Sequence, residues 1–216
     1  MSNENPQTRR VYRKRRRAQQ ETETRRTITE AAVKLHGTVG PARTTIKSIA
    51  VEAGVQRATV YRHFPDLESL FMSCSAHWAS LNPPPDPAEW SRVADPDQRL
   101  RRALTELYRW YVWAEPMLIN VYRDGPLVPA SARAGEGFRR HFEALHAALM
   151  RGRHTRGRAR VRLSATVGHA LDFATWRSLT REQRLETDEA VELMIALVAT
   201  AGQTRTAPRV AARTPR

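Results

Sequence analysis

Residues 45–64 read TIKSIAVEAGVQRATVYRHF, and this stretch decides the fold of the N-terminal part of the chain. The small side chain of Ala50 lets two helices cross closely, and Gly54 can adopt the left-handed conformation that ends a helix in a tight turn. Val55 is placed to pack beneath the turn, and Val60 to attach the second helix to the same core. The spacing therefore predicts a helix-turn-helix, with the second helix roughly perpendicular to the first.

The free face of that second helix carries groups suited to double-stranded DNA. Arg57 can read guanine and Gln56 can read adenine in the major groove. Hydroxyl and ring N–H groups can donate to phosphate oxygens, and the start of the preceding helix also attracts phosphate. The predicted DNA-binding residues are Arg43, Thr45, Lys47, Gln56, Arg57, Thr59, Tyr61, Arg62 and His63. The alternative is an ordinary three-helix corner in which Tyr61 and Phe64 are core aromatics.

Residues 25–71, with TTIKSIAVEAGVQRATVYRHFPDLESLF at their centre, resemble the N-terminal domain of the TetR/AcrR family of bacterial transcriptional regulators. The resemblance is carried by Thr45, Ile49-Ala50, Ala53-Gly54-Val55 and Thr59-Val60-Tyr61-Arg62-His63-Phe64. It implies a DNA-binding domain followed by a C-terminal domain that dimerises and binds a small effector. The rest of the chain resembles the family in helix count, helix length and a Glu-Pro-Met segment.

Two positions depart from the family pattern. Gln56 stands where a small helix-capping residue is common, and Leu67 stands where a lysine often contacts phosphate. Both changes remove local anchoring to DNA. We expect the basic arm Arg9–Arg17 to compensate by lying in or along the minor groove.

Helical periodicity dominates the remainder of the chain, and no alternating strand pattern is evident, so we predict an all-α protein. The proline-rich segment NPPPDP at residues 82–87 is a linker between a small and a larger helical bundle. We expect a disordered basic arm at 1–20, a helix-turn-helix DNA-binding domain at 21–80, an effector-binding and dimerisation domain at 88–202, and a disordered basic tail at 203–216.

About nine helices are predicted from caps, breakers and apolar spacing. Asp66 and Asp95 are the clearest N-caps, and Pro116 is expected to break or kink a helix. The expected helices cover roughly 24–36, 45–53, 56–63, 66–80, 96–113, 117–123, 132–151, 158–178 and 187–202.

The final helix, 187–202, is apolar nearly all round, so it must be buried on more than one side. Together with the helix at 158–178 it is predicted to form a four-helix interface in a homodimer. The alternative is that this helix is buried within its own subunit.

An effector pocket needs apolar walls with a few polar groups. His169, Asp172, Phe173 and Trp176 fall on one face if the helix at 158–178 is continuous, and the aromatics favour a planar or apolar ligand. The candidate pocket residues are Tyr108, Trp113, Met117, Tyr122, Phe142, His146, His169, Asp172, Phe173 and Trp176. No cofactor or metal is predicted; the alternative is a metal site formed by His146, His169 and Asp172.

The charge of the chain points to a polyanionic partner. Lys and Arg number 36 against 22 Asp and Glu, a formal net charge of +14, and much of the excess lies in the two ends. Hydrolase, zinc-protease and P-loop signatures and membrane-length apolar runs are not evident. Cys74 is expected to be an inert thiol in a reducing cytoplasm, with a redox sensor as the alternative.

We therefore expect a cytoplasmic homodimer that binds a palindromic DNA operator and acts as a repressor released by an unknown small molecule. The alternative is a charge-driven nucleic-acid binder with weak sequence preference that acts through its Arg-rich tails.

Overall fold

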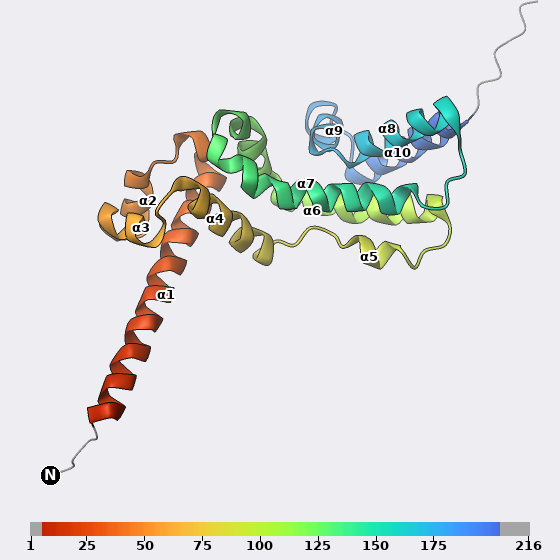
Figure 1. The fold of residues 1–216 in the computed structure, drawn as a ribbon. Coiled ribbons are helices and arrows are strands. Elements are labelled where there is room, and N and C mark those ends of the chain that lie inside the picture. The colour runs from red at the N-terminus through yellow and green to blue at the C-terminus, as the bar shows by residue number, and fades with distance from the viewer. Residues whose placement is uncertain (1–5, 204–216) are drawn as a thin grey trace, which may run out of the picture. The chain divides into compact units, whose positions relative to one another are not determined.

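The computed structural model describes residues 6–203, and every regular element in that range is helical. This confirms the predicted all-α class (Figure 1). The described α-helices are α1 (Pro6–Thr38), α2 (Ile46–Glu52), α3 (Arg57–His63), α4 (Leu67–Leu81), α5 (Pro87–Trp90), α6 (Pro96–Asp124), α7 (Ala132–Met150), α8 (Gly157–Leu171), α9 (Phe173–Arg177) and α10 (Thr187–Gly202). The expected basic tail lies outside the described residues from position 204 onward.

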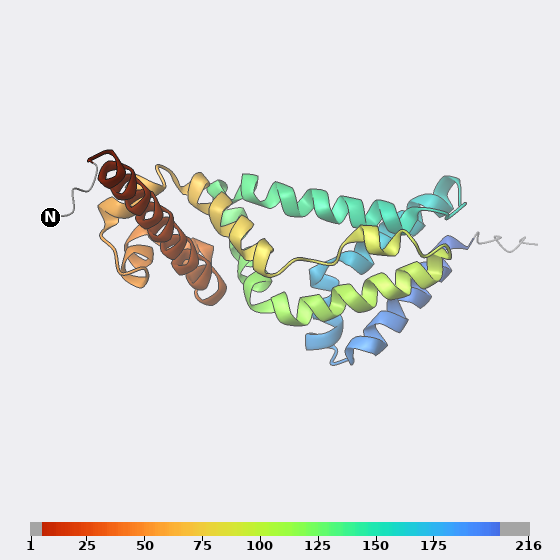
Figure 2. The same ribbon diagram turned by 90° about the horizontal axis from the view of Figure 1, so that it is seen from below.

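These residues form two compact units, each with its own core. The first contains residues 6–84 and 112–141, and the second contains residues 85–111 and 142–203, so α6 and α7 each begin in one unit and end in the other. In the first unit α1 packs against α2 and α4, and α2 packs against α3 (Figure 2). Its buried core consists of Ile28, Ala31, Ala32, Ile49, Ala50, Val60, Phe64, Leu70 and Cys74.

The arm expected to be disordered at 1–20 is helical from Pro6 onward, because α1 continues without a break to Thr38. Its residues are mostly Arg, Gln, Glu, Ala and Thr, and no glycine or internal proline interrupts them before Gly37. The packed C-terminal half supplies the nucleus, so each preceding residue needs only to extend an existing helix. Residues 1–5 lie outside the described residues.

The predicted break at Pro116 is wrong, because α6 runs through this residue to Asp124. The fixed φ of proline is compatible with a helix, but proline loses one helical hydrogen bond and crowds the carbonyl four residues earlier, at a cost of about 3 kcal/mol that the rest of a long helix can offset. The carbonyl of Pro116 accepts a hydrogen bond from Asn120 Nδ2 at 3.2 Å, so the following turn is held by a side chain as well as by the backbone. The start of α6 agrees with prediction: Asp95 Oδ1 accepts from the amides of Asp97 and Gln98 at 2.8 Å each.

The helix predicted at 158–178 is interrupted at Asp172, which ends α8 and caps α9. Its Oδ1 accepts a hydrogen bond from the amide of Ala174 at 2.8 Å, the competing local bond that favours Asp at helix starts. His169, Asp172, Phe173 and Trp176 therefore do not share one face of a continuous helix, and that expectation is corrected.

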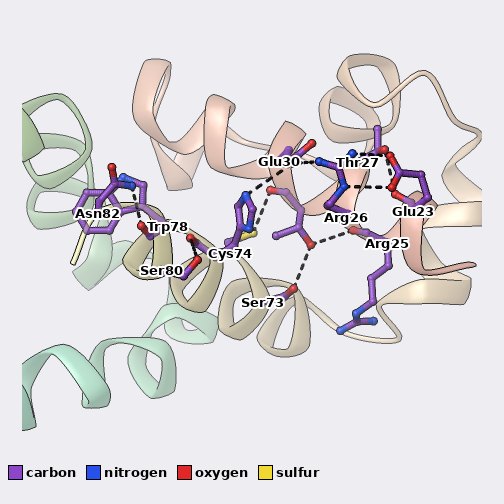
Figure 3. Close-up of polar contacts among 12 residues, drawn as sticks. Glu23, Arg25, Arg26, Thr27, Glu30, Ser73, Cys74, Trp78, Ser80 and Asn82 are labelled. Atoms are coloured by element: carbon purple, nitrogen blue, oxygen red, sulfur yellow. Dashed lines mark hydrogen bonds and ion pairs between the residues drawn. The ribbon is translucent and has the colours of Figure 1, made fainter. Parts of the chain in front are cut away.

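The contact between α1 and α4 fixes Cys74 in the first core (Figure 3). The thiol lies 3.9 Å from the carbonyl of Thr29, and burial raises the pKa of Cys74 to about 12. A thiol that is buried and protonated is a poor nucleophile, which favours the inert role over the redox sensor. On the solvent side, Arg26 bridges Glu23 and Glu30 along α1.

Candidate nucleic-acid interface

The turn between α2 and α3 has the local geometry that the sequence predicts. Thr45 and Ser48 form a reciprocal capping box, with the Ser48 amide donating to Thr45 Oγ1 at 3.0 Å and the Thr45 amide to Ser48 Oγ at 2.9 Å. After α2, Gly54 adopts a φ of 65°, and the amide of Val55 donates to the carbonyl of Ala50 at 2.9 Å. The left-handed glycine therefore redirects the chain within two residues into α3.

Helix α3 is attached to the core by one side and leaves the other side in solvent. Val60 and Phe64 are buried at 0% and 1% exposure. Tyr61 is 50% exposed, whereas the three-helix-corner alternative required both Tyr61 and Phe64 in the core. The second helix is thus neither tucked inward nor continuous with α2, which is the arrangement a recognition helix needs.

The predicted DNA-binding residues gather around this exposed side and the start of α2. Gln56 caps α3 with its backbone only, so its amide group is not used as a helix cap. The guanidinium of Arg43 is tethered by a 2.7 Å bond from Nε to the carbonyl of Val39. Exposed members are Arg43, Thr45, Lys47, Gln56, Arg57, Tyr61 and Arg62, while Thr59 and His63 are half-buried.

His63 occupies a different environment from the other eight. Its Nε2 is buried without a hydrogen-bond partner among the described residues. Burial, followed by the nearby positive charges of Arg62 and Arg25, lowers the pKa of His63. The ring is therefore neutral at neutral pH, and it cannot serve as a cation for phosphate there.

Arg25 is a residue of this region that sequence reasoning missed. Its Nη1 donates to the carbonyl of His63 at the end of α3, and its guanidinium lies 4.0 Å from the centre of the Phe64 ring. A cation beside the last carbonyls also complements the negative end of the helix dipole. Arg25 thereby connects α1 to the exposed helix, and no spacing rule in the sequence could have paired residues 38 positions apart.

The connection between α1 and α2 is anchored by the C-terminal turn of α6. Asn120 Nδ2 donates to the carbonyls of His36 and Gly37 at 3.1 and 2.9 Å. Asp124 Oδ2 accepts from the amide of Ala42 at 3.1 Å, and the adjacent Arg123 holds the pKa of this carboxyl below its ordinary value. The entry to the helix-turn-helix is thus fixed by buried polar groups.

His36 completes this anchor with an apolar contact. Its ring stacks on Phe71 with 4.8 Å between centroids, and it is 5% exposed. Burial lowers the pKa of His36 to about 4, so the ring is neutral at neutral pH.

Comparison with known proteins agrees with this geometry. Residues 28–74, which include α2, the Gly54 turn and α3, match the family model described as bacterial regulatory proteins, tetR family. This part of the chain is therefore similar to the helix-turn-helix region of tetR-family regulatory proteins.

Solved structures share the fold of this chain. A TetR-like regulator from Rhodococcus sp. RHA1 superposes with a TM-score of 0.56 at 20% identity, covering 83% of this chain and 97% of that one. PfmR from Thermus thermophilus superposes with a TM-score of 0.56 at 20% identity, covering 82% of this chain and 99% of that one. A tetR-family regulator from Streptomyces coelicolor superposes with a TM-score of 0.58 at 19% identity, covering 83% of this chain and 82% of that one. No curated protein matches the chain.

Four of the ten candidate pocket residues form a packed core around Tyr111. The Tyr111 ring centre lies 5.4 Å from that of Phe173 and 5.6 Å from that of Trp176. The Tyr108 hydroxyl donates to the carbonyl of Ala170 at 3.0 Å. The four are Tyr108, Phe142, Phe173 and Trp176, whose ring centres lie 6.2, 6.5, 5.4 and 5.6 Å, respectively, from that of Tyr111.

The remaining candidates are dispersed. Trp113 and Tyr122 are exposed on the part of α6 that belongs to the first unit, where Met117 is half-buried. His169 is exposed and hydrogen-bonds Thr175, and Asp172 is a helix cap. One cavity lies in the second unit, and His146 alone of the ten candidates lines it.

That cavity lies among α5, α7 and α8 and has a volume of about 670 Å³. His146 Nε2 lies 2.9 Å from the carbonyl of Ser164 in its wall. Two guanidinium groups and no carboxylate line it. The lining consists of Pro87, Ala88, Ser91, Ala144, His146, Ala147, Ala148, Met150, Arg151, Arg160 and Ser164. His146 is the one predicted pocket residue at this place, and sequence reasoning missed Arg151 and Arg160 as lining residues.

Within residues 6–203, no three His, Cys, Asp or Glu side chains are grouped to hold a metal ion, which speaks against the His146, His169 and Asp172 alternative. None of the helices within residues 6–203 has both the length and the apolarity to cross a membrane.

Proposed function

We propose that this protein is a TetR-family regulator, which acts in the cytoplasm as a homodimer that represses transcription from a palindromic operator. Two copies of α3 would enter successive major grooves about 34–36 Å apart. The observation that carries this proposal is the exposed side of α3, where Arg57 and Gln56 are free for base edges while Val60 and Phe64 hold the helix in place. DNA binding is assigned to residues 21–80, and dimerisation and effector binding to 88–202.

Selection and footprinting test the operator. Full-length protein would enrich duplexes from a random library, and the enriched duplex would then be footprinted. We expect a short palindrome with protection confined to its two half-sites. Uniform protection of every duplex, without an enriched motif, would contradict the proposal and support a charge-driven binder acting through its basic ends.

Helices α8 and α10 support the dimer. They pack against each other along their length, and apolar side chains remain outside that contact. Val161 on α8 is 57% exposed, and Leu193 and Leu197 on α10 are 40% and 46% exposed. Scattered apolar residues are normal on a surface, but three on two neighbouring helices suit a helix-pair interface with a second copy.

The cavity of the second unit supports an effector with an anionic group. Arg151 and Arg160 can pair with a carboxylate or phosphate, and Met150 with neighbouring alanines supplies an apolar wall. Such a ligand releases the operator only by binding the two states of the protein unequally.

A release assay tests this site. Carboxylates of graded apolar size would be screened for release of the selected duplex, with the matching neutral amides as controls. We expect a carboxylate to act and Arg160→Ala to raise the required concentration about tenfold, because a hydrogen bond to a charged group is worth about 1.5–3 kcal/mol. Operator affinity of the unliganded variant should be unchanged. Equal release by acid and amide, or by wild type and variant, would contradict an anionic effector in this cavity.

A further inference from the structure

Helix α1 continues well beyond the core that holds it. Arg25 contacts the end of α3, and every residue from Arg10 to Glu23 is exposed. Figure 1 shows this first half of α1 projecting past α2 and α3. Because α1 is one unbroken helix, the half that packs on the core fixes the direction of the half that projects.

Four cations fall on one face of this projection. Arg10, Arg13, Lys14 and Arg17 are spaced i, i+3, i+4 and i+7, the spacing of a single helical stripe. Each lies 18 residues before a member of the set Ile28, Ala31, Ala32 and Leu35, which packs on the first core. Eighteen residues make about five turns of an α-helix, so the basic stripe continues the side of α1 that faces α2 and α4.

The stripe is free to bind and is placed beyond α3. Among the described residues none of its four cations has an ion-pair partner, whereas the nearby acids Glu23 and Glu30 are taken by Arg26. At about 1.5 Å per residue, Arg17 lies about 12 Å and Arg10 about 22 Å past Arg25 along the helix axis. The major groove is about 12 Å wide, so these distances are long enough to reach phosphates outside a groove that α3 would occupy.

We propose that the α1 face formed by Arg10, Arg13, Lys14 and Arg17 is a second DNA-binding surface, which contacts backbone phosphates outside the groove read by α3. The inference rests on the proposed operator binding. It replaces the expected minor-groove arm, because a helix about 10–12 Å across does not enter a groove about 6 Å wide. Phosphate contacts of this kind add affinity and lengthen the site without adding sequence preference.

Two variants with equal charge test the face. Arg13→Gln with Arg17→Gln removes two cations from the stripe, and Arg15→Gln with Arg16→Gln removes two from other sides of the same helix. Affinity for the selected duplex would be measured against salt. Each lost phosphate contact flattens the log–log slope by about 0.9, so we expect about 1.8 for the stripe pair and less than half of that for the control. Equal losses in the two pairs would overturn the proposal.

A third variant tests rigidity with all charges retained. Ala18→Pro interrupts α1 between the stripe and the core, far from Ile28 and the packed residues. We expect the log–log slope of its affinity against salt to flatten as that of the stripe pair does. Its thermal unfolding should show that the core is intact. Wild-type affinity and slope in this variant would show that a flexible basic arm suffices and would overturn the rigid surface. Enrichment of a palindrome tests operator binding separately. If a palindrome is enriched and the stripe variants bind it with wild-type affinity and salt slope, this inference alone is refuted.

Discussion

Replacing Leu193 and Leu197 together by Glu is expected to separate the two subunits and to lower affinity for the palindromic operator about 10²–10⁴-fold. A dimer holds its second half-site at high effective concentration, and this advantage is lost when the subunits part. Both side chains are 40–46% exposed on the same side of α10, so their replacement leaves the buried Val191, Met194 and Val198 in place. The measurement is sedimentation together with operator binding.

A matched control separates dimerisation from added charge. Val112→Glu with Val121→Glu also places two acids at half-exposed apolar positions, at 46% and 39% exposure, but on α6. We expect this control to remain a dimer and to bind the operator. A dimeric Leu193→Glu, Leu197→Glu protein would contradict the assignment of the interface to α8 and α10.

The caps and turns of the first unit could be predicted from the sequence because they depend on neighbours within about four residues. Thr45 and Asp66 cap α2 and α4, with Asp66 Oδ1 accepting from the Ser69 amide at 2.6 Å. Gly54 has the positive φ that the turn requires. Local hydrogen-bond chemistry decides such positions, whatever the rest of the chain does.

Errors arose where two local tendencies compete. Pro116 ends many helices, yet α6 passes through it, and Asp172 interrupts a segment whose apolar spacing suggested one continuous helix. The basic arm has the composition of a disordered tail, but α1 extends through it from a packed half. For Pro116 and the basic arm the deciding contribution is the stability of adjoining structure, which a short sequence window does not contain. At Asp172 the local hydrogen bond from the Ala174 amide to Oδ1 outweighs the apolar spacing.

Contacts between distant residues could not be predicted at all. Asn120 and Asp124 hold the connection between α1 and α2, and Arg25 holds the end of α3, across 38 to 84 positions. The cavity near Arg160 likewise depends on how α5, α7 and α8 pack. The exposure of the nine residues predicted to bind DNA is given with the interface above, and their contacts with DNA stay a prediction.

Recognition of the DNA base sequence is expected to depend most on Arg57. It is exposed on the first turn of α3, the part of a recognition helix that contacts base edges. A bidentate arginine–guanine contact contributes about 1–3 kcal/mol of discrimination against the wrong base. Lys47, exposed at the start of α2, is the control, because loss of a phosphate contact lowers affinity equally on all sequences and flattens the salt slope by about 0.9.

The most direct test of recognition by α3 is a base-by-base comparison of Arg57→Ala with Lys47→Ala on every single substitution of the selected operator. We expect Arg57→Ala to abolish the preference at one position in each half-site, by about 1–3 kcal/mol, and Lys47→Ala to preserve the whole pattern. An Arg57→Ala protein with the wild-type pattern of preferences, or an equal loss on all sequences, would contradict this expectation.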